Sequence, residues 1–136
     1  MGYELREHTA DVAVEAAGET LGAVFAAVAD GMAAAMCETV PAGGGRTDVS
    51  VTAEGRAALL FDYLDRLIYE RDVRSVLPVD NDATVARTDG DWRLEGSYRA
   101  VPLAEVTARD LKAVTYSEMD ISETDERWRA YVVFDV

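Results

Sequence analysis

The sequence predicts an α+β fold in which two amphipathic helices pack on a mixed, mainly antiparallel sheet. Two segments carry apolar residues at steps of three and four, and several others alternate apolar and polar residues. An Asp-Gly pair, typical of a tight hairpin turn, separates two of the alternating segments. The chain has 136 residues, 49% of them apolar, and no linker divides it. We therefore expect a single domain spanning residues 1–136, with a compact core.

The first elements are a strand and a helix. Residues 11–16, DVAVEA, alternate as a half-buried strand with Asp11 at its start. From Thr20 the period changes to that of a helix, for which Thr20 is available as the N-cap. The apolar positions of this helix are Leu21, Val24, Phe25, Val28, Met32 and Met36. The loop PAGGGRT ends it.

The rest of the sequence predicts further strands and a second helix, again from the periodicity of apolar residues. Residues 48–55, DVSVTAEG, alternate as a second strand, and residues 83–88 and 92–100 flank Asp89-Gly90 as a hairpin. The last strand-like segment, residues 127–136, is apolar on both faces near its end, which indicates a central strand. One face of the second helix is formed by Leu60, Tyr63, Leu64, Leu67 and Ile68.

The charge balance limits the possible partners. Acidic residues outnumber basic ones 26 to 13, for a net charge of −13. Direct binding to nucleic acid is not expected, because it depends on Lys and Arg clusters that neutralise phosphates. A basic partner protein or a cation fits better. Lys112 is the only lysine, and this arginine-biased, acidic, alanine-rich composition is typical of proteins from halophilic archaea.

The sequence lacks the motifs of most kinds of catalytic site. His8 and Cys37 are the only histidine and the only cysteine, so neither a histidine metal cluster nor an intramolecular disulfide can form, which suits a reducing cytoplasm. The glycine-rich segments lack the pattern of a phosphate-binding loop, and Asp80-Asn81-Asp82 is only a fragment of a calcium loop. The longest apolar stretch is too short to span a bilayer. We assign no catalytic residues and expect neither an enzyme nor a membrane anchor.

Three features at the ends of predicted elements remain as candidate functional sites. Asp135 ends an apolar strand, and its carboxylate and the oxygens of Val136, joined by the carboxylate of Asp11, could ligate a hard cation. The alternative is that both aspartates are simply hydrated at strand ends. Lys112 opens a strand, either because the site needs a compact ammonium group or by chance. His8 precedes Asp11 by three residues.

Four blocks of the chain closely resemble the archease family, in the same order and at similar spacing. They are HTADVAVEAAGETLGAVFAAVADGM, LLFDYLDRLIY, DLKAVTY and VVFDV. The resemblance implies a small α+β protein that is not itself a ligase. It implies a cofactor of the RtcB-type tRNA-splicing RNA ligase, which promotes ligase guanylylation and multiple turnover and broadens nucleotide use. The rival hypothesis is a stand-alone cation-binding or chaperone-like module without a ligase partner.

The resemblance also implies roles for individual residues. Asp11, Asp135 and Val136 match positions that hold calcium or a similar cation, and Lys112 matches the lysine of the same functional surface. His8 matches the motif histidine, whose role is either functional or a structural hydrogen bond. Ala13 stands where the family commonly has glycine, which affects contacts around the site and not the cation ligands themselves.

Overall fold

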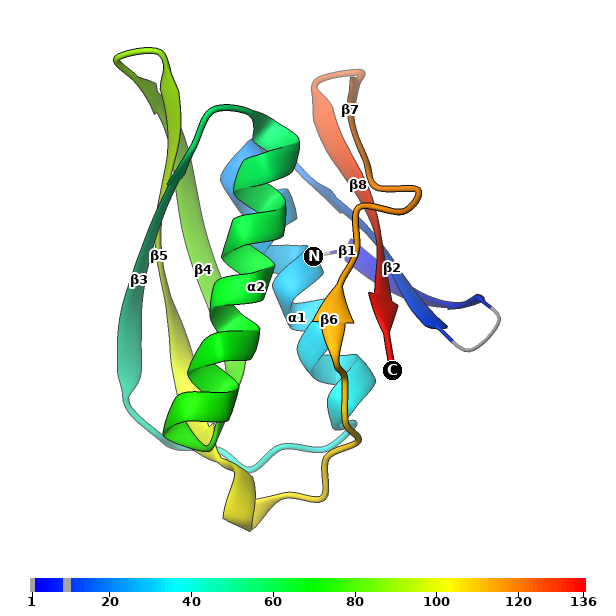
Figure 1. The fold of residues 1–136 in the computed structure, drawn as a ribbon, viewed down its shortest axis with the longest axis vertical. Helices are drawn as coiled ribbons and strands as arrows, with labels where there is room; N and C mark the ends of the chain where they lie inside the picture. Colours follow the sequence, from blue (N-terminus) through cyan, green and yellow to red (C-terminus); the bar gives the residue numbers. More distant parts are fainter. Residues whose placement is uncertain (1, 9–10) are drawn as a thin grey trace.

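The computed structural model describes residues 2–8 and 11–136, with the side chains of residues 6–8 outside the described set. Two helices lie between two sheets (Figure 1). The predicted α+β class is confirmed. The strands, which were expected to form one mixed sheet, are divided between two, and each strand pair among the described residues is antiparallel.

The larger sheet has five strands among the described residues. Its order is β1 (Gly2–His8), β2 (Asp11–Gly18), β8 (Arg127–Asp135) and β6 (Ala113–Val114), and β7 (Asp120–Thr124) also pairs with β8. The prediction that the last strand is central is confirmed, since β8 has neighbours on both sides. Val132 and Phe134, on the face of β8 that meets the core, are fully buried.

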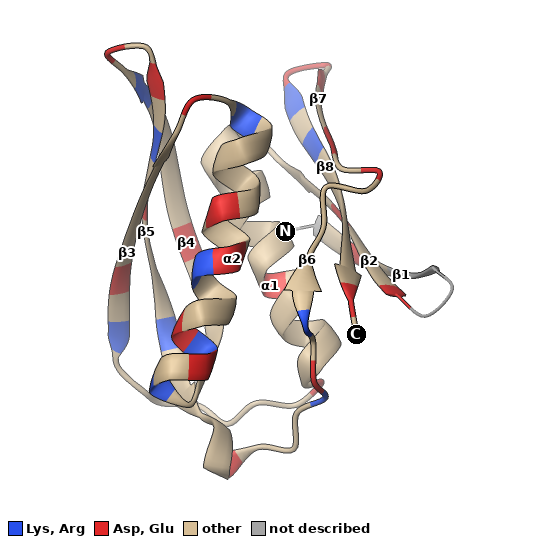
Figure 2. Ribbon diagram, viewed as in Figure 1, with Lys and Arg blue, Asp and Glu red and all other residues tan. Residues whose placement is uncertain are grey.

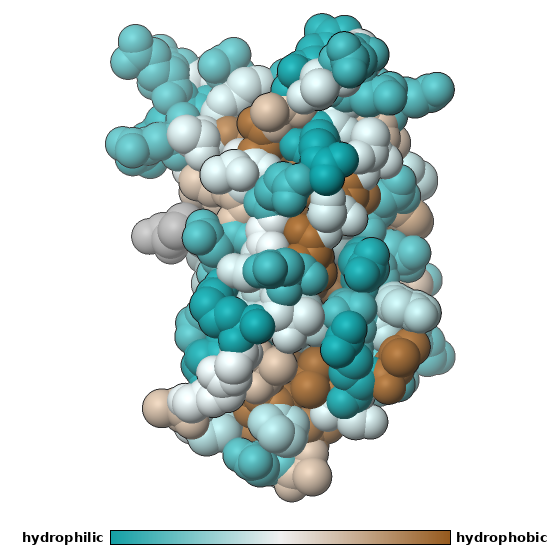
Figure 3. Space-filling model, turned by 90° about the vertical axis from the view of Figure 1, so that its left-hand side faces the viewer, coloured by the Kyte–Doolittle hydropathy of each residue, from teal (hydrophilic) through white to brown (hydrophobic). Residues whose placement is uncertain are grey.

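The smaller sheet has three strands in the order β3 (Arg46–Ala53), β5 (Asp91–Pro102) and β4 (Val76–Thr88). The hairpin at Asp89-Gly90 is confirmed as the β4–β5 connection. The short 3-10 helix η1 (Leu103–Glu105) then begins the crossing to β6. The outer face of this sheet is largely hydrophilic (Figure 3), as expected for a sheet that packs on helices with one face only.

Helix α1 (Leu21–Met36) begins where the sequence predicts, because the Thr20 hydroxyl accepts a hydrogen bond of 3.0 Å from the Ala23 amide. It contacts β4 of the smaller sheet and β1, β2 and β8 of the larger one. Lying between two sheets, it is buried around almost its whole circumference, which explains its high content of alanine. Among the described residues, no helix combines the length and apolar character that crossing a bilayer requires.

Helix α2 (Arg56–Arg74) is amphipathic, as predicted, with Leu60, Tyr63, Leu64 and Leu67 fully buried. Its opposite face is charged, and acidic residues are spread over both sheets, α2 and the loops (Figure 2). Among the described residues the negative charge therefore forms no single patch, and an individual aspartate gains significance only from its neighbours.

Strand β4 begins earlier than the alternating pattern indicates, and it includes Asp80-Asn81-Asp82. The β4–β5 register shifts between Val79 and Asp82, and Asp80 has a φ of 47°, so this stretch forms a β-bulge. The backbone N and the Nδ2 of Asn81 each donate to Oδ1 of Asp30 on α1, at 2.9 Å. The fragment that resembles a calcium loop therefore has a structural role, which is to join the bulge to α1.

The burial of Asp30 at this contact predicts how the stability of the protein depends on pH. Burial raises the pKa of Asp30 above its ordinary value, with repulsion from Asp80 in the same direction, and these outweigh the hydrogen bonds from Asn81 and the charge of Arg46. Asp30 therefore stays protonated to a higher pH in the folded chain than in the unfolded chain. As a result, the free energy of unfolding falls as the pH rises from 3.8 through the folded pKa of Asp30.

Asp30→Asn is expected to remove that component of the pH dependence and to be at least as stable as the wild type at pH 7, because the amide oxygen still accepts both bonds from Asn81. Asp30→Ala is expected to lose about 1–3 kcal/mol, because it leaves the Asn81 donors without their acceptor. Urea unfolding between pH 4 and pH 8 measures both. An Asn variant with the wild-type pH slope would contradict the assignment.

Candidate functional site

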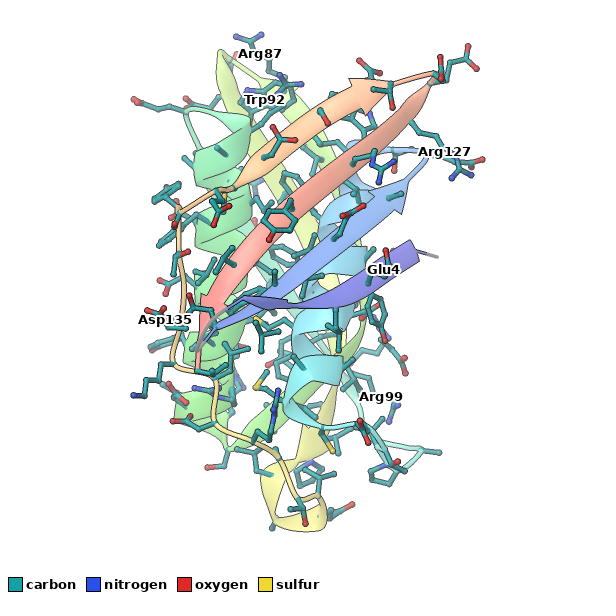
Figure 4. The ribbon with its side chains drawn as sticks, turned by 90° about the vertical axis from the view of Figure 1, so that its right-hand side faces the viewer. Glu4, Arg87, Trp92, Arg99, Arg127 and Asp135 are labelled. Carbon is teal, nitrogen blue, oxygen red and sulfur yellow. The ribbon has the colours of Figure 1, made fainter. Side chains whose placement is uncertain are left out.

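The strand-end features predicted from the sequence meet at one end of the five-stranded sheet. Asp11, the first residue of β2, lies directly opposite Asp135, the last residue of β8. Ala113, the first residue of β6, lies opposite Asp135 on the other side. Figure 4 shows Asp135 at this end of β8, with Arg127 at the far end of the strand. Residues from the beginning and the end of the sequence thus become neighbours.

The two carboxylates share one face of the sheet. Directly opposed residues on antiparallel strands have Cβ atoms about 5 Å apart and side chains on the same side. Their neighbours Val12 and Phe134 pack toward the core, so Asp11 and Asp135 lie on the outer face, which neither of the described helices covers. Ala13 and Val133, the next pair on this face, are nearly inaccessible to solvent. Like charges directly opposite one another are unfavourable, and a cation between them would offset the repulsion.

Lys112 is fixed beside this pair through its backbone. Its amide donates to the Asp135 carbonyl at 2.8 Å, just before β6 begins at Ala113. Thr115 continues the attachment, donating from both its amide and its hydroxyl to the Val133 carbonyl at 3.0 Å. The Lys112 side chain is exposed, and no ion pair holds it within the part of the chain that the structure describes. Its ammonium group is available to an external partner.

The other two predicted residues lie at the same end. Val136 follows β8 directly, next to Asp135 in the chain, and is exposed. The backbone of His8 pairs with Asp11 at the end of β1. The side chain of His8 lies outside the described residues, so its proposed role stays a prediction.

The donor set determines which cations fit. Carboxylate and carbonyl oxygens are ligands for hard cations such as calcium, whereas structural zinc takes nitrogen and sulfur ligands. Within residues 2–8 and 11–136 as described, no group of three or more His, Cys, Asp or Glu side chains could hold a metal ion. Calcium takes roughly six to eight oxygens. The oxygens of Asp11, Asp135 and Val136 are of the type that a hard cation takes, but by themselves they would form only part of its ligand set.

Arg71 is a residue at this site that our sequence analysis missed. It is buried on α2, and its Nη1 donates at 2.7 Å to the carbonyl of Leu111, the residue before Lys112. Arg109 anchors the same segment to the end of α1, with its amide bonded to the Met36 carbonyl at 2.7 Å and its Nε to the Ala35 carbonyl at 3.1 Å. A signal was present, since Arg71 continues the apolar stripe of α2 four residues after Leu67.

A second buried charge, Glu70, belongs to a separate cluster. Burial alone would raise the pKa of its carboxyl, but hydrogen bonds from Tyr98 and Arg66 and the charge of Arg74 outweigh it and lower the pKa. The Tyr98 hydroxyl donates to it at 2.8 Å, joining α2 to β5. This cluster holds α2 on the three-stranded sheet and takes no part in the site at Asp135.

Comparisons with known proteins agree with this architecture. Residues 3–136 match the sequence model of the Archease protein family (MTH1598/TM1083). The archease of Methanothermobacter thermautotrophicus is 32% identical over 99% of both chains, and that of Pyrococcus furiosus is 29% identical over 98% of both. The solution structure of Methanobacterium thermoautotrophicum protein 1598 is similar with a TM-score of 0.84 at 28% identity, over 99% of each chain. The crystal structure of a Thermotoga maritima archease, described as a possible chaperone, has the same fold, with a TM-score of 0.66 at 18% identity over 100% of this chain and 98% of that one.

Proposed function

The chain belongs to the archease family, and on that premise we propose that it is an activating cofactor of an RtcB-type tRNA-splicing RNA ligase in the cytoplasm. It promotes guanylylation and multiple turnover of the ligase and broadens its nucleotide use, without catalysing a reaction itself. The observation that carries this proposal is the direct pairing of Asp11 with Asp135, beside a lysine whose backbone is bonded to Asp135.

The proposal assigns each residue a physical task. Asp11, Asp135 and the Val136 carbonyl hold calcium or a similar divalent cation, which when bound neutralises charge on phosphate oxygens. Lys112 contributes a mobile positive charge next to these ligands and contacts either a phosphate of the nucleotide or a carboxylate of the ligase. Guanylylation brings a triphosphate to a ligase histidine, so charges placed beside the phosphates favour the step.

The incomplete ligand set also supports a role that requires a partner. Two carboxylates and a carbonyl leave several coordination positions of a calcium-like ion open. In the isolated protein water fills these positions around the cation, and in the complex the ligase or its nucleotide replaces that water, so the cation links this end of the sheet to the partner. The charge of −13 suits a basic cleft in that partner.

The decisive experiment is single-turnover guanylylation of the ligase with and without the protein, at high salt and with defined divalent metals. We expect Asp11→Ala and Asp135→Ala to reduce the stimulation by about tenfold or more, because losing one ligand costs both charge and coordination. Asp120→Ala, an aspartate of the same sheet on β7, is the matched control and should stimulate like the wild type. Unchanged stimulation by the Asp11 and Asp135 variants would refute the assignment.

Co-purification separates this proposal from the rival hypothesis. A ligase cofactor should recover an RNA ligase from the host, and the recovered ligase should respond to added protein. A stand-alone chaperone-like module should leave ligase activity unchanged and should instead suppress aggregation of unrelated unfolded proteins.

A further inference from the structure

One peptide group beside the candidate site is held at both of its ends. The peptide between Leu111 and Lys112 accepts a hydrogen bond at its carbonyl from Nη1 of Arg71, at 2.7 Å. Its N–H, which belongs to Lys112, donates to the carbonyl of Asp135 at 2.8 Å. Hydrogen bonds in such a chain polarise and strengthen one another. The position of the Lys112 backbone relative to Asp135 therefore depends directly on an arginine of α2.

Burying this arginine is costly unless its donors are used. The Arg71 side chain is only 9% exposed and lies on the apolar stripe of α2, where a leucine would pack without desolvating a charge. Two of its nitrogens contact three different groups. Besides the Leu111 carbonyl, Nη1 contacts the sulfur of Met36 at 3.3 Å, and Nε bonds Asp72 at 2.9 Å. A planar guanidinium can make these contacts at the same time, whereas a lysine ammonium cannot.

We propose that Arg71 is a positioning residue for Lys112, holding the lysine backbone in place beside Asp135 so that the exposed, mobile ammonium stays within reach of the cation ligands. The burial of Leu111, whose side chain is 1% exposed, prevents the same segment from rotating. The functional part of this inference rests on the proposed role of Lys112 in ligase activation, but the structural part does not.

Amide hydrogen exchange tests the structural part without any ligase. In Arg71→Met we expect the Lys112 amide to exchange about tenfold faster or more, the effect of losing one hydrogen bond from a charged donor. Arg71→Lys should restore part of the protection. Arg66→Met is the matched control, because Arg66 lies on the same helix but bonds Glu70. Wild-type protection of the Lys112 amide in Arg71→Met would overturn the proposal.

A double-mutant cycle tests the functional part. Arg71→Met and Lys112→Ala should each reduce the stimulation of ligase guanylylation, and the double variant should lose no more than Lys112→Ala alone, because Arg71 acts through Lys112. Calcium affinity, measured by titration calorimetry, should stay within about twofold of the wild type in Arg71→Met, because both carboxylates remain. Losses that multiply in the double variant would overturn the positioning role. If Lys112→Ala stimulates like the wild type, the proposed role of Lys112 fails, and hydrogen exchange still decides whether Arg71 holds the peptide.

Discussion

Saturating calcium is expected to raise the melting temperature of the protein by about 10 °C, and Asp135→Asn is expected to abolish this rise. A ligand that binds only the folded state at a hundred times its dissociation constant stabilises by about 2.7 kcal/mol. For a domain of this size each kcal/mol corresponds to roughly 4 °C. The asparagine variant keeps the shape of Asp135 but removes half of the paired charge that attracts the cation.

The same substitution should have the opposite effect without calcium. With chelator present, Asp11 and Asp135 are like charges in directly opposed positions, so Asp135→Asn is expected to melt slightly higher than the wild type. Scanning calorimetry with calcium and with chelator measures both effects. Asp120→Asn should respond to calcium like the wild type. A calcium response that survives in Asp135→Asn would place the cation elsewhere on the molecule.

The elements were predictable because periodicity reports which residues face the core. It located both helices, the Thr20 cap and the central position of the last strand. It could not reveal two sheets, because alternation in one strand contains no information about which strand is its neighbour. The start of β4 was missed for a local reason. Pro78 and the Asp80-Asn81-Asp82 bulge interrupt the alternation, and Asn81 in the bulge is hydrogen-bonded to Asp30 of α1, a contact that the local pattern does not show.

The candidate site was predictable in part. The pattern placed Asp11, Lys112 and Asp135 at the ends of strands, and the family resemblance suggested that they act together. Their proximity follows from the β2–β8 and β6–β8 pairings, which are long-range contacts that a local sequence pattern does not contain. Arg71 was missed because its role depends on a peptide forty residues away in the sequence. A charged residue on a buried helical stripe is the signal that would have identified it.

Gly22→Ala is expected to destabilise the protein by about 3 kcal/mol or more, although alanine normally favours a helix by roughly 1 kcal/mol over glycine. Gly22 lies in the first turn of α1, against β4. A Cβ atom there would lie 2.4 Å from the Ala83 carbonyl oxygen and 2.8 Å from the Thr84 Cα. Both are backbone atoms in a strand paired with β5, so the clash cannot be relieved by turning a side chain.

Urea unfolding measures this effect, with Gly55→Ala as the control. Gly55 is the N-cap of α2, where a Cβ atom would meet nothing within 4 Å, so its change should stay within about 1 kcal/mol. Because α1 contacts strands of both sheets, we expect Gly22→Ala to lower the midpoint of one cooperative transition and not to split it into two. Two separate transitions would mean that the sheets unfold independently, and wild-type stability would mean that α1 and β4 are farther apart than the Gly22 contact requires.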